Sequence, residues 1–582
     1  MSSYPDISNE EFYERIYNKY KKYKIPAKKL TFDQICFPKT FSLQQPQDFL
    51  ADYINPKTPY KGILVFHRIG AGKTCTAVNI GEKWKNKRKI MVLTPASLKG
   101  NFRDELRSPC AGNEYLTNAE RIALTKRHPS SDEYKQIIKK SDDRINKYYS
   151  IYSYNKFVEL YQTNEINLKN TVLIVDEIQN MVSEGGTFYK VLYEAIYGAP
   201  SNLRIVLLSA TPMFDKPVEI ALTMNLLRIP HQFPTGKEFE KIFINVTTKS
   251  NGEIVTEAKN IDMFKEMIKG YVSYYRGAPP YTFPESIVKY VKCEMDDFQY
   301  RSYITVLEQE EKNIESPIKR KHRVFTDGQI RSLPNNFFIG TRVISNISFP
   351  NKNVSEKGYK SFVGSALSFK NLKKYSIKFY KIMKKISRSS GTSFVYSNFK
   401  EYGGIKSFVK VLEYHGFLSY AEHGEGHKRF AVWSGDEKTE LKDEIKAVFN
   451  QPMNANGSKI KVLLLSPSAK EGISFKRIQQ VHILEPYWNI SRLDQIIGRA
   501  VRYCSHRDMP EDKRIVKVYI YIATHPNELE TVDEYIKNLA FRKNKLIEQF
   551  AIAMKESAID CQLFKNGNVY ADMDEPNLKC VK

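Results

Sequence analysis

The chain has 582 residues, 42% of them hydrophobic, and at on the order of 100–200 residues per domain it should hold about three to five folded units. Lys and Arg number 90 against 65 Asp and Glu, so the formal net charge is +25. The length makes a single domain an unsuitable interpretation. The surplus of positive charge has to face either a polyanion or solvent, and nucleic acid is the leading candidate partner, although many basic proteins bind none.

Targeting segments and cysteines give further expectations. The first residues, MSSYPDISNEEFYERI, lack the basic and apolar regions of a secretory signal, and no apolar run approaches the ~18 residues of a membrane span. We therefore expect a protein that is neither secreted nor held in a membrane. The seven cysteines are scattered, and the closest two are 19 residues apart, at 561 and 580. This spacing matches neither a zinc ribbon nor a disulfide framework, so we expect a reducing compartment and no structural metal cluster.

The pattern of apolar runs predicts two α/β lobes in tandem, each a doubly wound parallel sheet. Four short runs rich in branched residues precede helix-length segments in the first lobe, at 62–66, 89–93, 171–175 and 204–208. Five more follow in the second lobe, at 392–397, 429–434, 461–466, 480–485 and 517–523. The predicted organisation is a helical N-terminal preface (1–40), a first RecA-like lobe (41–235), a linker with an inserted helical element (236–370), a second RecA-like lobe (371–530) and a helical C-terminal tail (531–582).

The first lobe contains a candidate phosphate-binding loop. HRIGAGKT, residues 67–74, lies between the run GILVF and a helix-like segment. A turn of this kind surrounds phosphate oxygens with backbone N–H groups, and the helix N-terminus adds favourable potential. We expect an ATP site in which Lys73 reaches the β/γ-phosphates and the Thr74 hydroxyl binds Mg²⁺. The rest of that loop is assigned to ATP binding as His67, Arg68, Ile69, Gly70, Ala71 and Gly72, although His67 stands where the general pattern has its first glycine.

Two further strand ends in the first lobe carry polar residues. Asp176 and Glu177 follow the run TVLIV, where open α/β sheets bind their ligands. Asp176 is predicted to hold Mg²⁺ and Glu177 to deprotonate the attacking water, with Gln179 beside the nucleotide. An acidic pair can also simply cap the next helix, and only the nearby lysine loop favours the catalytic interpretation. At the third strand end, Ser209 and Thr211 are predicted to couple hydrolysis to movement.

The second lobe is predicted to complete the ATP site. Arg499 and Arg502 lie three residues apart, so on a helix they would share a face and could supply positive charge to the transferring γ-phosphoryl group. Gln495, in the same segment, and Gly472, in the loop after KVLLLS, are assigned to the nucleotide. The basic stretch 370–388 has interleaved apolar residues and predicts an amphipathic helix whose charged side more often faces solvent than a ligand.

In this order the motifs resemble those of the superfamily 2 helicases, and more closely the Snf2-like and viral branch. Gln47 resembles the adenine-reading glutamine, and HRIGAGKT, DEIQ, LSATP, EGISF and QIIGRAVR resemble motifs I, II, III, V and VI. The segments GYVSYYRG (270–277) and KESAIDC (555–561) are similar to poxvirus-type helicases of nucleocytoplasmic large DNA viruses and cytoplasmic linear plasmids. That family includes the viral nucleoside triphosphate phosphohydrolase I and the small subunit of the early transcription factor.

The resemblance implies an ATP-driven motor that uses Mg²⁺ and grips a nucleic-acid backbone. Its implied backbone contacts are Thr94, Ser97, Ser397 and Ser474. It favours duplex DNA as the partner, and work beside a multisubunit RNA polymerase or transcription factor at initiation or termination, in the host cytoplasm or packaged in a virion. An RNA helicase stays open, because these motifs do not distinguish the two nucleic acids. A DNA-binding scaffold without turnover is disfavoured by the presence of Lys73, Glu177 and Arg502.

Overall fold

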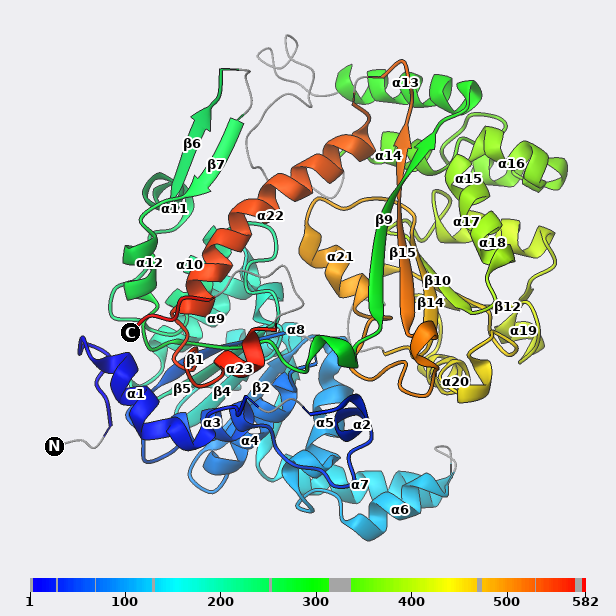
Figure 1. Cartoon of the computed structure of the whole chain (residues 1–582). Helices are drawn as coiled ribbons and strands as arrows, with labels where there is room; N and C mark the ends of the chain where they lie inside the picture. The colour runs from blue at the N-terminus through cyan, green and yellow to red at the C-terminus, as the bar shows by residue number, and fades with distance from the viewer. Residues whose placement is uncertain are drawn as a thin grey trace. The chain divides into compact units, whose positions relative to one another are not determined.

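The computed structural model describes residues 4–27, 30–68, 70–127, 131–250, 254–312, 337–467, 474–528, 530–570 and 578–582, which form two compact units (Figure 1). Unit 1 comprises Met1–Thr247, Val255–Pro280 and Lys545–Lys582, and unit 2 comprises Thr248–Ile254 and Tyr281–Asn544. Each unit contains a parallel sheet with helices. The prediction of two α/β lobes in tandem is therefore confirmed.

The sheet of unit 1 has six parallel strands in the order β3-β2-β4-β5-β1-β8. They are β1 (Gly62–His67), β2 (Lys89–Thr94), β3 (Tyr149–Ser153), β4 (Thr171–Val175), β5 (Arg204–Ser209) and β8 (Val272–Tyr275). All four strands expected in this lobe are present, and β1, β4 and β5 are buried along their whole length. β3 and β8 were not predicted, because Tyr and Ser interrupt their apolar pattern.

Helices and a small hairpin complete unit 1. The helices are α1 (Phe12–Tyr20), α2 (Phe32–Cys36), α3 (Gln45–Tyr53), α4 (Lys73–Trp84), α5 (Lys99–Arg107), α6 (Asn118–Thr125), α7 (Asp132–Asn146), α8 (Tyr154–Gln162), α9 (Thr187–Gly198), α10 (Val218–Asn225), α11 (Gly236–Phe243), α12 (Ile261–Met267) and α23 (Lys565–Asn568), and the hairpin pairs β6 (Ile244–Thr248) with β7 (Ile254–Ala258). Several helices begin at a hydroxyl cap that the sequence supplies. Thr117 and Glu120 form a capping box at α6, and Ser153 caps α8.

Both ends of the chain contribute to the core of unit 1. Phe12 and Ile16 of α1 are fully buried in the same apolar cluster as Phe49 of α3 and Phe564 near the C-terminus. The rings of Phe49 and Phe564 pack edge to face with centroids 5.6 Å apart. The first and last segments are therefore parts of this core and not appendages to it.

The sheet of unit 2 has seven parallel strands in the order β11-β12-β13-β10-β14-β15-β9. They are β9 (Glu285–Glu294), β10 (Thr392–Tyr396), β11 (Leu418–Ser419), β12 (Arg429–Trp433), β13 (Val462–Leu465), β14 (Ile478–Ile483) and β15 (Ile515–Thr524). The five predicted strands are present. β9 comes from the stretch 236–370, where the sequence showed no single period, and it pairs with β15 over ten residues at the edge of the sheet. Its mostly exposed, Lys-rich pattern suits an edge position, and this is why it does not look like a buried strand.

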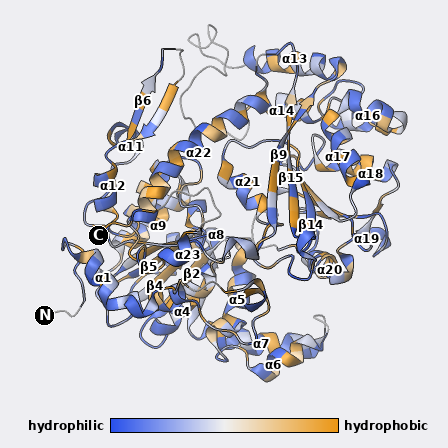
Figure 2. Ribbon diagram, in the orientation of Figure 1, coloured by the Kyte–Doolittle hydropathy of each residue, from blue (hydrophilic) through white to orange (hydrophobic). Residues whose placement is uncertain are grey.

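The helices of unit 2 pack on this sheet with their apolar sides. They are α13 (Asp297–Lys312), α14 (Ile339–Asn346), α15 (Glu356–Ser361), α16 (Phe369–Tyr375), α17 (Ile377–Arg388), α18 (Ile405–Tyr414), α19 (Tyr420–His423), α20 (Thr439–Phe449) and α21 (Ile490–Ile497). Figure 2 shows hydrophilic and hydrophobic residues interleaved along these helices. α22 (Val532–Glu556) is long, and its residues are shared between the two units. Within the described residues, we find no helix with both the length and the apolar character that a membrane span requires.

The basic stretch 370–388 forms two helices, α16 and α17, instead of the single helix predicted, because Ser376 caps a new helix start. α17 is amphipathic as predicted, with one exception to its charge pattern. Phe379, Ile382 and Ile386 are buried, whereas Lys384 is exposed. Lys378, in contrast, is fully buried, and its Nζ lies 2.6 Å from Asp533 Oδ2 and 2.9 Å from Asn346 Oδ1. Two charges in a core are tolerated only when each has partners, so this pair ties α17 to the start of α22.

We expect Lys378→Met to lower the free energy of unfolding of unit 2 by about 3–5 kcal/mol, because it leaves Asp533 buried without its counter-ion. The double variant Lys378→Met/Asp533→Leu should lose less than this single variant. Urea denaturation followed by fluorescence measures both values. The exposed Lys384→Met is the matched control on the same helix, and a single variant no less stable than this control would contradict the assignment.

Candidate functional site

Three neighbouring strands of unit 1 end at the same edge of its sheet. β5 lies between β4 and β1, and the pairings Phe66↔Ser209 and Val175↔Leu207 bring their carboxyl ends level. The loop after β1, the acidic pair after β4 and Ser209 at the end of β5 therefore lie close together. This is the edge at which open parallel sheets bind ligands.

The glycines of the loop after β1 are required by its backbone. Gly70 and Gly72 have φ of 87° and 71°, in the left-handed region that side chains rarely adopt. A Cβ on Gly72 would also lie 2.4 Å from Gln47 Nε2. Gln47 is buried, donates from Nε2 to the Gly72 carbonyl at 3.4 Å, and accepts from Gln44 N at 2.9 Å through Oε1. The side chain predicted to contact adenine is thus packed against the loop.

The remaining residues of this loop differ in their exposure. Arg68 is exposed, Ala71 is buried, and Thr74 is half-buried in the first turn of α4. Ile69 lies outside the described residues. His67 is fully buried, with Nε2 3.0 Å from Ser273 Oγ. Burial and the nearby Lys73 charge lower the pKa of His67 to about 3, so its imidazole is neutral at physiological pH.

A continuous series of polar contacts joins the three strand ends. Lys73 Nζ lies 2.9 Å from Glu177 Oε1, and Gln179 Nε2 donates to Glu177 Oε2 at 2.6 Å. Ser209 Oγ donates to Gln179 Oε1 at 2.7 Å, and Thr211 N donates to Ser209 Oγ at 3.0 Å. The five residues, each a candidate from the sequence, form one contact chain. The central position of Gln179 was not foreseen from the sequence. Its side-chain amide has both a donor and an acceptor, and here it donates to the Glu177 carboxylate and accepts from the Ser209 hydroxyl.

The backbone fixes the acidic pair. Asp176 is buried, its N donates to the Leu93 carbonyl at 2.8 Å, and its Oδ1 accepts from Glu177 N at 3.0 Å. Glu177 adopts φ 51° and ψ 52°, which aims its carboxylate at Lys73. The Tyr154 hydroxyl donates to the carbonyls of both acidic residues. Sequence reasoning did not identify Tyr154, since an aromatic residue after a short strand carries no specific signal.

The candidate residues of unit 2 lie after α21 and within it. Gln495 is half-buried on the helix, which ends at Ile497 with Gly498 as its C-cap. The expectation that Arg499 and Arg502 share a helix face is therefore wrong, since both follow the helix end. Arg499 is buried, and Arg502 donates from Nε to the Gly498 carbonyl at 2.9 Å. Burial lowers the pKa of Arg502 to about 10, so it still carries its charge at neutral pH. Gly472 lies outside the described residues.

The four candidates for nucleic-acid contact divide into two pairs. Thr94 and Ser397 are fully buried, and Ser397 Oγ lies 3.2 and 3.1 Å from the two carboxylate oxygens of the buried Glu485. Ser97 is exposed and Ser474 is partly exposed. In this conformation a phosphate backbone could reach only the second pair.

A disulfide lies directly behind the candidate loop. Cys75, in the first turn of α4, is bonded to Cys110, 35 residues later, and both sulfurs are buried. The Glu105 carboxylate lies within 4.8 Å of both, and burial raises its pKa. A second disulfide joins Cys561 to Cys580. The expectation of no disulfides is wrong for these four cysteines, because pairing depends on the fold and their spacing follows no known framework.

Comparison with known proteins places this chain among helicases. The family described as helicase conserved C-terminal domain matches residues 377–504. A putative ATP-dependent RNA helicase of Acanthamoeba polyphaga mimivirus is 55% identical, with 99% of each chain covered. A termination factor NPH-I homolog of African swine fever virus is 26% identical over 86% of this chain and 76% of its own length. Among solved structures, the Pyrococcus furiosus Hef helicase domain aligns with a TM-score of 0.41 at 14% identity, covering 82% of this chain and 94% of that one.

We expect the variant Cys75→Ala/Cys110→Ala to lower the free energy of unfolding of unit 1 by about 3–4 kcal/mol, from the 35-residue loop that the bond closes. Denaturation of the variant and the parent chain should be compared without and with reductant. The difference should shrink to under about 1 kcal/mol in reductant, where neither chain has the bond. An equal difference in both conditions would mean that packing, and not the disulfide, stabilises this region.

Proposed function

Because the chain belongs to the viral branch of the superfamily 2 helicases and is therefore an ATP-dependent nucleic-acid motor, we propose that unit 1 binds ATP at the edge defined by Lys73, Asp176 and Glu177. The observation that carries this proposal is the contact chain from Lys73 through Glu177 and Gln179 to Ser209. It joins the phosphate loop, the acidic pair and the third strand end, so a change in the bound phosphates can shift the side chains at all three places.

Each residue at this edge has a role that fits its chemistry. Lys73 would hold the β/γ-phosphates together with the backbone of Gly70 and Gly72. The Thr74 hydroxyl and the Asp176 carboxylate offer the oxygen ligands that Mg²⁺ prefers, and the bound ion would neutralise phosphate charge. Glu177 would orient and deprotonate the attacking water, and Gln47 would contact the base.

The proposal also gives the arginines of unit 2 a role in hydrolysis. Arg499 is buried and Arg502 is partly buried, and the field of a guanidinium in such a site is screened less by solvent than it would be at the surface. We assign them to the γ-phosphoryl group of the ATP, whose charge grows as the bond to the leaving group breaks. Gln495 and Gly472 would lie near the same nucleotide.

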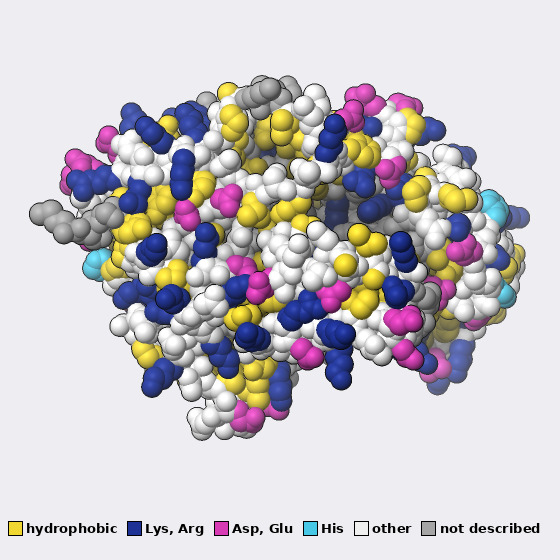
Figure 3. Space-filling view, turned by 90° about the horizontal axis from the view of Figure 1, so that it is seen from below, with side chains coloured by type: hydrophobic (Ala, Val, Ile, Leu, Met, Phe, Trp, Pro, Cys, Tyr) yellow, Lys and Arg dark blue, Asp and Glu magenta, His cyan; other side chains and the backbone are white. Residues whose placement is uncertain are grey.

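The proposed nucleic-acid substrate is DNA, with duplex DNA favoured, and the proposed process is viral-type transcription, at initiation or termination. The similarity to a protein named as a termination factor supports this setting. The net charge of +25 suits a polyanionic partner, and Figure 3 shows Lys and Arg side chains spread among acidic ones over the face it displays. Ser97 and Ser474 would contact the backbone. The proposed partner is a multisubunit RNA polymerase, and the proposed place of action is the host cytoplasm.

An RNA helicase is the second candidate function. It is favoured by the name of the mimivirus relative, which is a putative ATP-dependent RNA helicase. Stimulation of ATP hydrolysis by duplex DNA, single-stranded DNA and RNA, measured in parallel, separates the two candidates. A response to RNA alone would replace the DNA proposal.

We expect Lys73→Ala and Glu177→Gln to lower nucleic-acid-stimulated ATP hydrolysis on the order of 100-fold or more, because each removes a group that acts on the reacting phosphates. The measurement is phosphate release at saturating ATP and nucleic acid. Matched controls are Lys83→Ala, a largely exposed lysine on the same helix, and Glu184→Gln, an exposed glutamate. Turnover of either active-site variant at the level of its control would refute the proposed site.

We expect Gln179→Ala to lower the factor by which nucleic acid stimulates ATP hydrolysis by about tenfold, because it breaks the contact chain between Glu177 and Ser209 at the cost of two hydrogen bonds. Hydrolysis without nucleic acid should change less. Rates with and without nucleic acid give the factor, with the exposed Gln162→Ala as control. An unchanged factor would mean that coupling takes another route.

A further inference from the structure

The C-terminal segment of unit 1 covers the edge of its sheet next to the candidate ATP loop. We define the C-terminal brace as residues 556–568, from the last residue of α22 to the end of α23. β8 is the edge strand, and on its open side Ile559 N donates to the Val272 carbonyl at 2.9 Å. Two side chains of the brace take the place of a further strand. Asp560 Oδ1 accepts from Tyr274 N at 2.9 Å, and Asn568 Oδ1 accepts from Arg276 N at 2.8 Å.

Asp560 also reaches the strand that carries the loop, through one serine. Its Oδ2 accepts from Ser273 Oγ, and Ser273 Oγ lies 3.0 Å from His67 Nε2 at the end of β1. His67, Ser273 and Asp560 are each fully buried. Since the serine hydroxyl proton is directed to the carboxylate, the serine oxygen accepts from His67, whose Nε2 then carries the proton. Burial raises the pKa of Asp560 to about 7, and its two donors act against that shift.

The other side of β8 lies directly against the loop. His67 pairs with Tyr275 in the sheet, and Arg68 N donates to the Tyr275 carbonyl at 3.0 Å. Gly277, with φ of 99°, packs so closely that a Cβ there would lie 3.0 Å from Ala71 N. Segment 275–277 thus supports His67, Arg68 and Ala71 from below, and its conformation depends on the contacts that hold β8.

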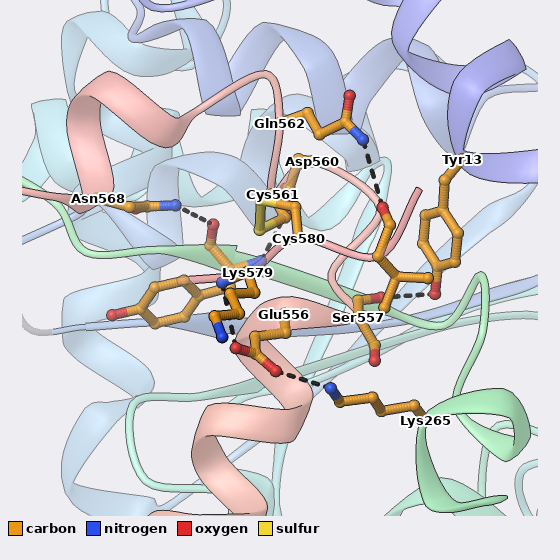
Figure 4. The surroundings of a disulfide bond; sticks show 12 residues. Tyr13, Lys265, Glu556, Ser557, Asp560, Cys561, Gln562, Asn568, Lys579 and Cys580 are labelled. Atoms are coloured by element: carbon orange, nitrogen blue, oxygen red, sulfur yellow. Dashed lines mark hydrogen bonds and ion pairs between the residues drawn. A yellow bond between two sulfur atoms is a disulfide. The ribbon is translucent and has the colours of Figure 1, made fainter. Parts of the chain in front are cut away.

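Hydrogen bonds, an ion pair and a disulfide hold the brace in place (Figure 4). Figure 4 shows the disulfide between Cys561 and Cys580 beside Asp560, with Glu556 accepting from Lys579 N and pairing with Lys265 Nζ at 2.7 Å. Tyr13 OH donates to the Ser557 carbonyl at 2.9 Å. The brace is held to α1, to α12 and to the end of the chain, so it can act as a fixed support.

We propose that Ser273 and Asp560 are positioning residues for the nucleotide loop: through β8 and His67, the C-terminal brace holds residues 67–68 and 70–72 in the conformation that binds the phosphates of ATP. This inference rests on the proposed function of that loop. A loop with two left-handed glycines is flexible on its own. If neighbouring contacts order this loop before ATP binds, the affinity for ATP is higher, and removing those contacts lowers the affinity. Neither positioning residue touches the nucleotide, so their effect is on binding and not on the chemical step.

The test compares ATP hydrolysis by Ser273→Ala and Asp560→Ala with that of the parent full-length chain. Ser557→Ala is the matched control, because Ser557 is also a fully buried serine of this region and its hydroxyl makes no hydrogen bond among the described residues. The readouts are the KM for ATP and kcat at saturating nucleic acid, together with the Kd of a fluorescent ATP analogue. Partial unfolding lowers the active fraction and hence the apparent kcat, but leaves KM unchanged, so KM separates positioning from mere stability.

We expect Ser273→Ala to raise KM and Kd about five- to tenfold, with kcat changed less than about twofold, and Ser557→Ala to change neither constant. Asp560→Ala should raise KM further. If that variant does not fold, the KM of Ser273→Ala alone tests the inference. A KM for Ser273→Ala within twofold of the Ser557→Ala value would overturn the inference. Lys73→Ala is run alongside. If it retains turnover, the proposed function fails, and if it is inactive while Ser273→Ala keeps the parent KM, only the inference fails.

Discussion

The parallel pairing of β4, β5 and β1 is the constraint on which the chemistry of unit 1 depends. Each strand is buried along its whole length, so a shift of one residue would exchange side chains of different size between two close-packed faces and is disfavoured. The register therefore delivers Lys73, Glu177 and Ser209 to one edge from positions more than 100 residues apart in the chain. Gln179 then needs only to bridge the short distance between a carboxylate and a hydroxyl. The positions of these side chains at the sheet edge are therefore fixed by the packing of the buried strands.

The sequence allowed much of this arrangement to be predicted, for a physical reason. Buried parallel strands are continuous apolar runs, and the loop and acidic pair directly follow two of them, so both the fold and the ATP-site candidates could be recognised. Features that depend on distant contacts could not. β9 is mostly exposed at a sheet edge and carries Lys and Glu, and β8, although buried, interrupts its short run with Ser and Tyr, so neither strand has a continuous apolar pattern. The link of Tyr154 to the acidic pair, the pairing of Cys75 with Cys110, and the helix end before Arg499 likewise need the folded chain.

Both units bury charged groups, and in each unit the charge joins segments that are far apart in sequence. Lys378 and Asp533 connect α17 with α22 in unit 2, and Glu485 there accepts from Ser397 and Asn346. Burial raises the pKa of Glu485, and the Asn398 N–H that it accepts from acts against this shift. In unit 1, Asp560 connects the C-terminal brace with β8. A buried charge costs free energy unless its partners are in place, so each of these contacts favours one arrangement of its segments over near alternatives.

The backbone at Glu177 carries a further consequence. Its φ of 51° places a side chain with a Cβ in the left-handed region, where a residue other than glycine is disfavoured by roughly 1–2 kcal/mol. A glycine would relieve this strain, yet it would remove the carboxylate that Lys73 and Gln179 contact. Under the proposed function, stability and activity therefore make opposite demands on this single position. A selection for thermal stability that did not require ATP hydrolysis would therefore favour Glu177→Gly, and under the proposed function the selected protein would withstand heat but no longer hydrolyse ATP.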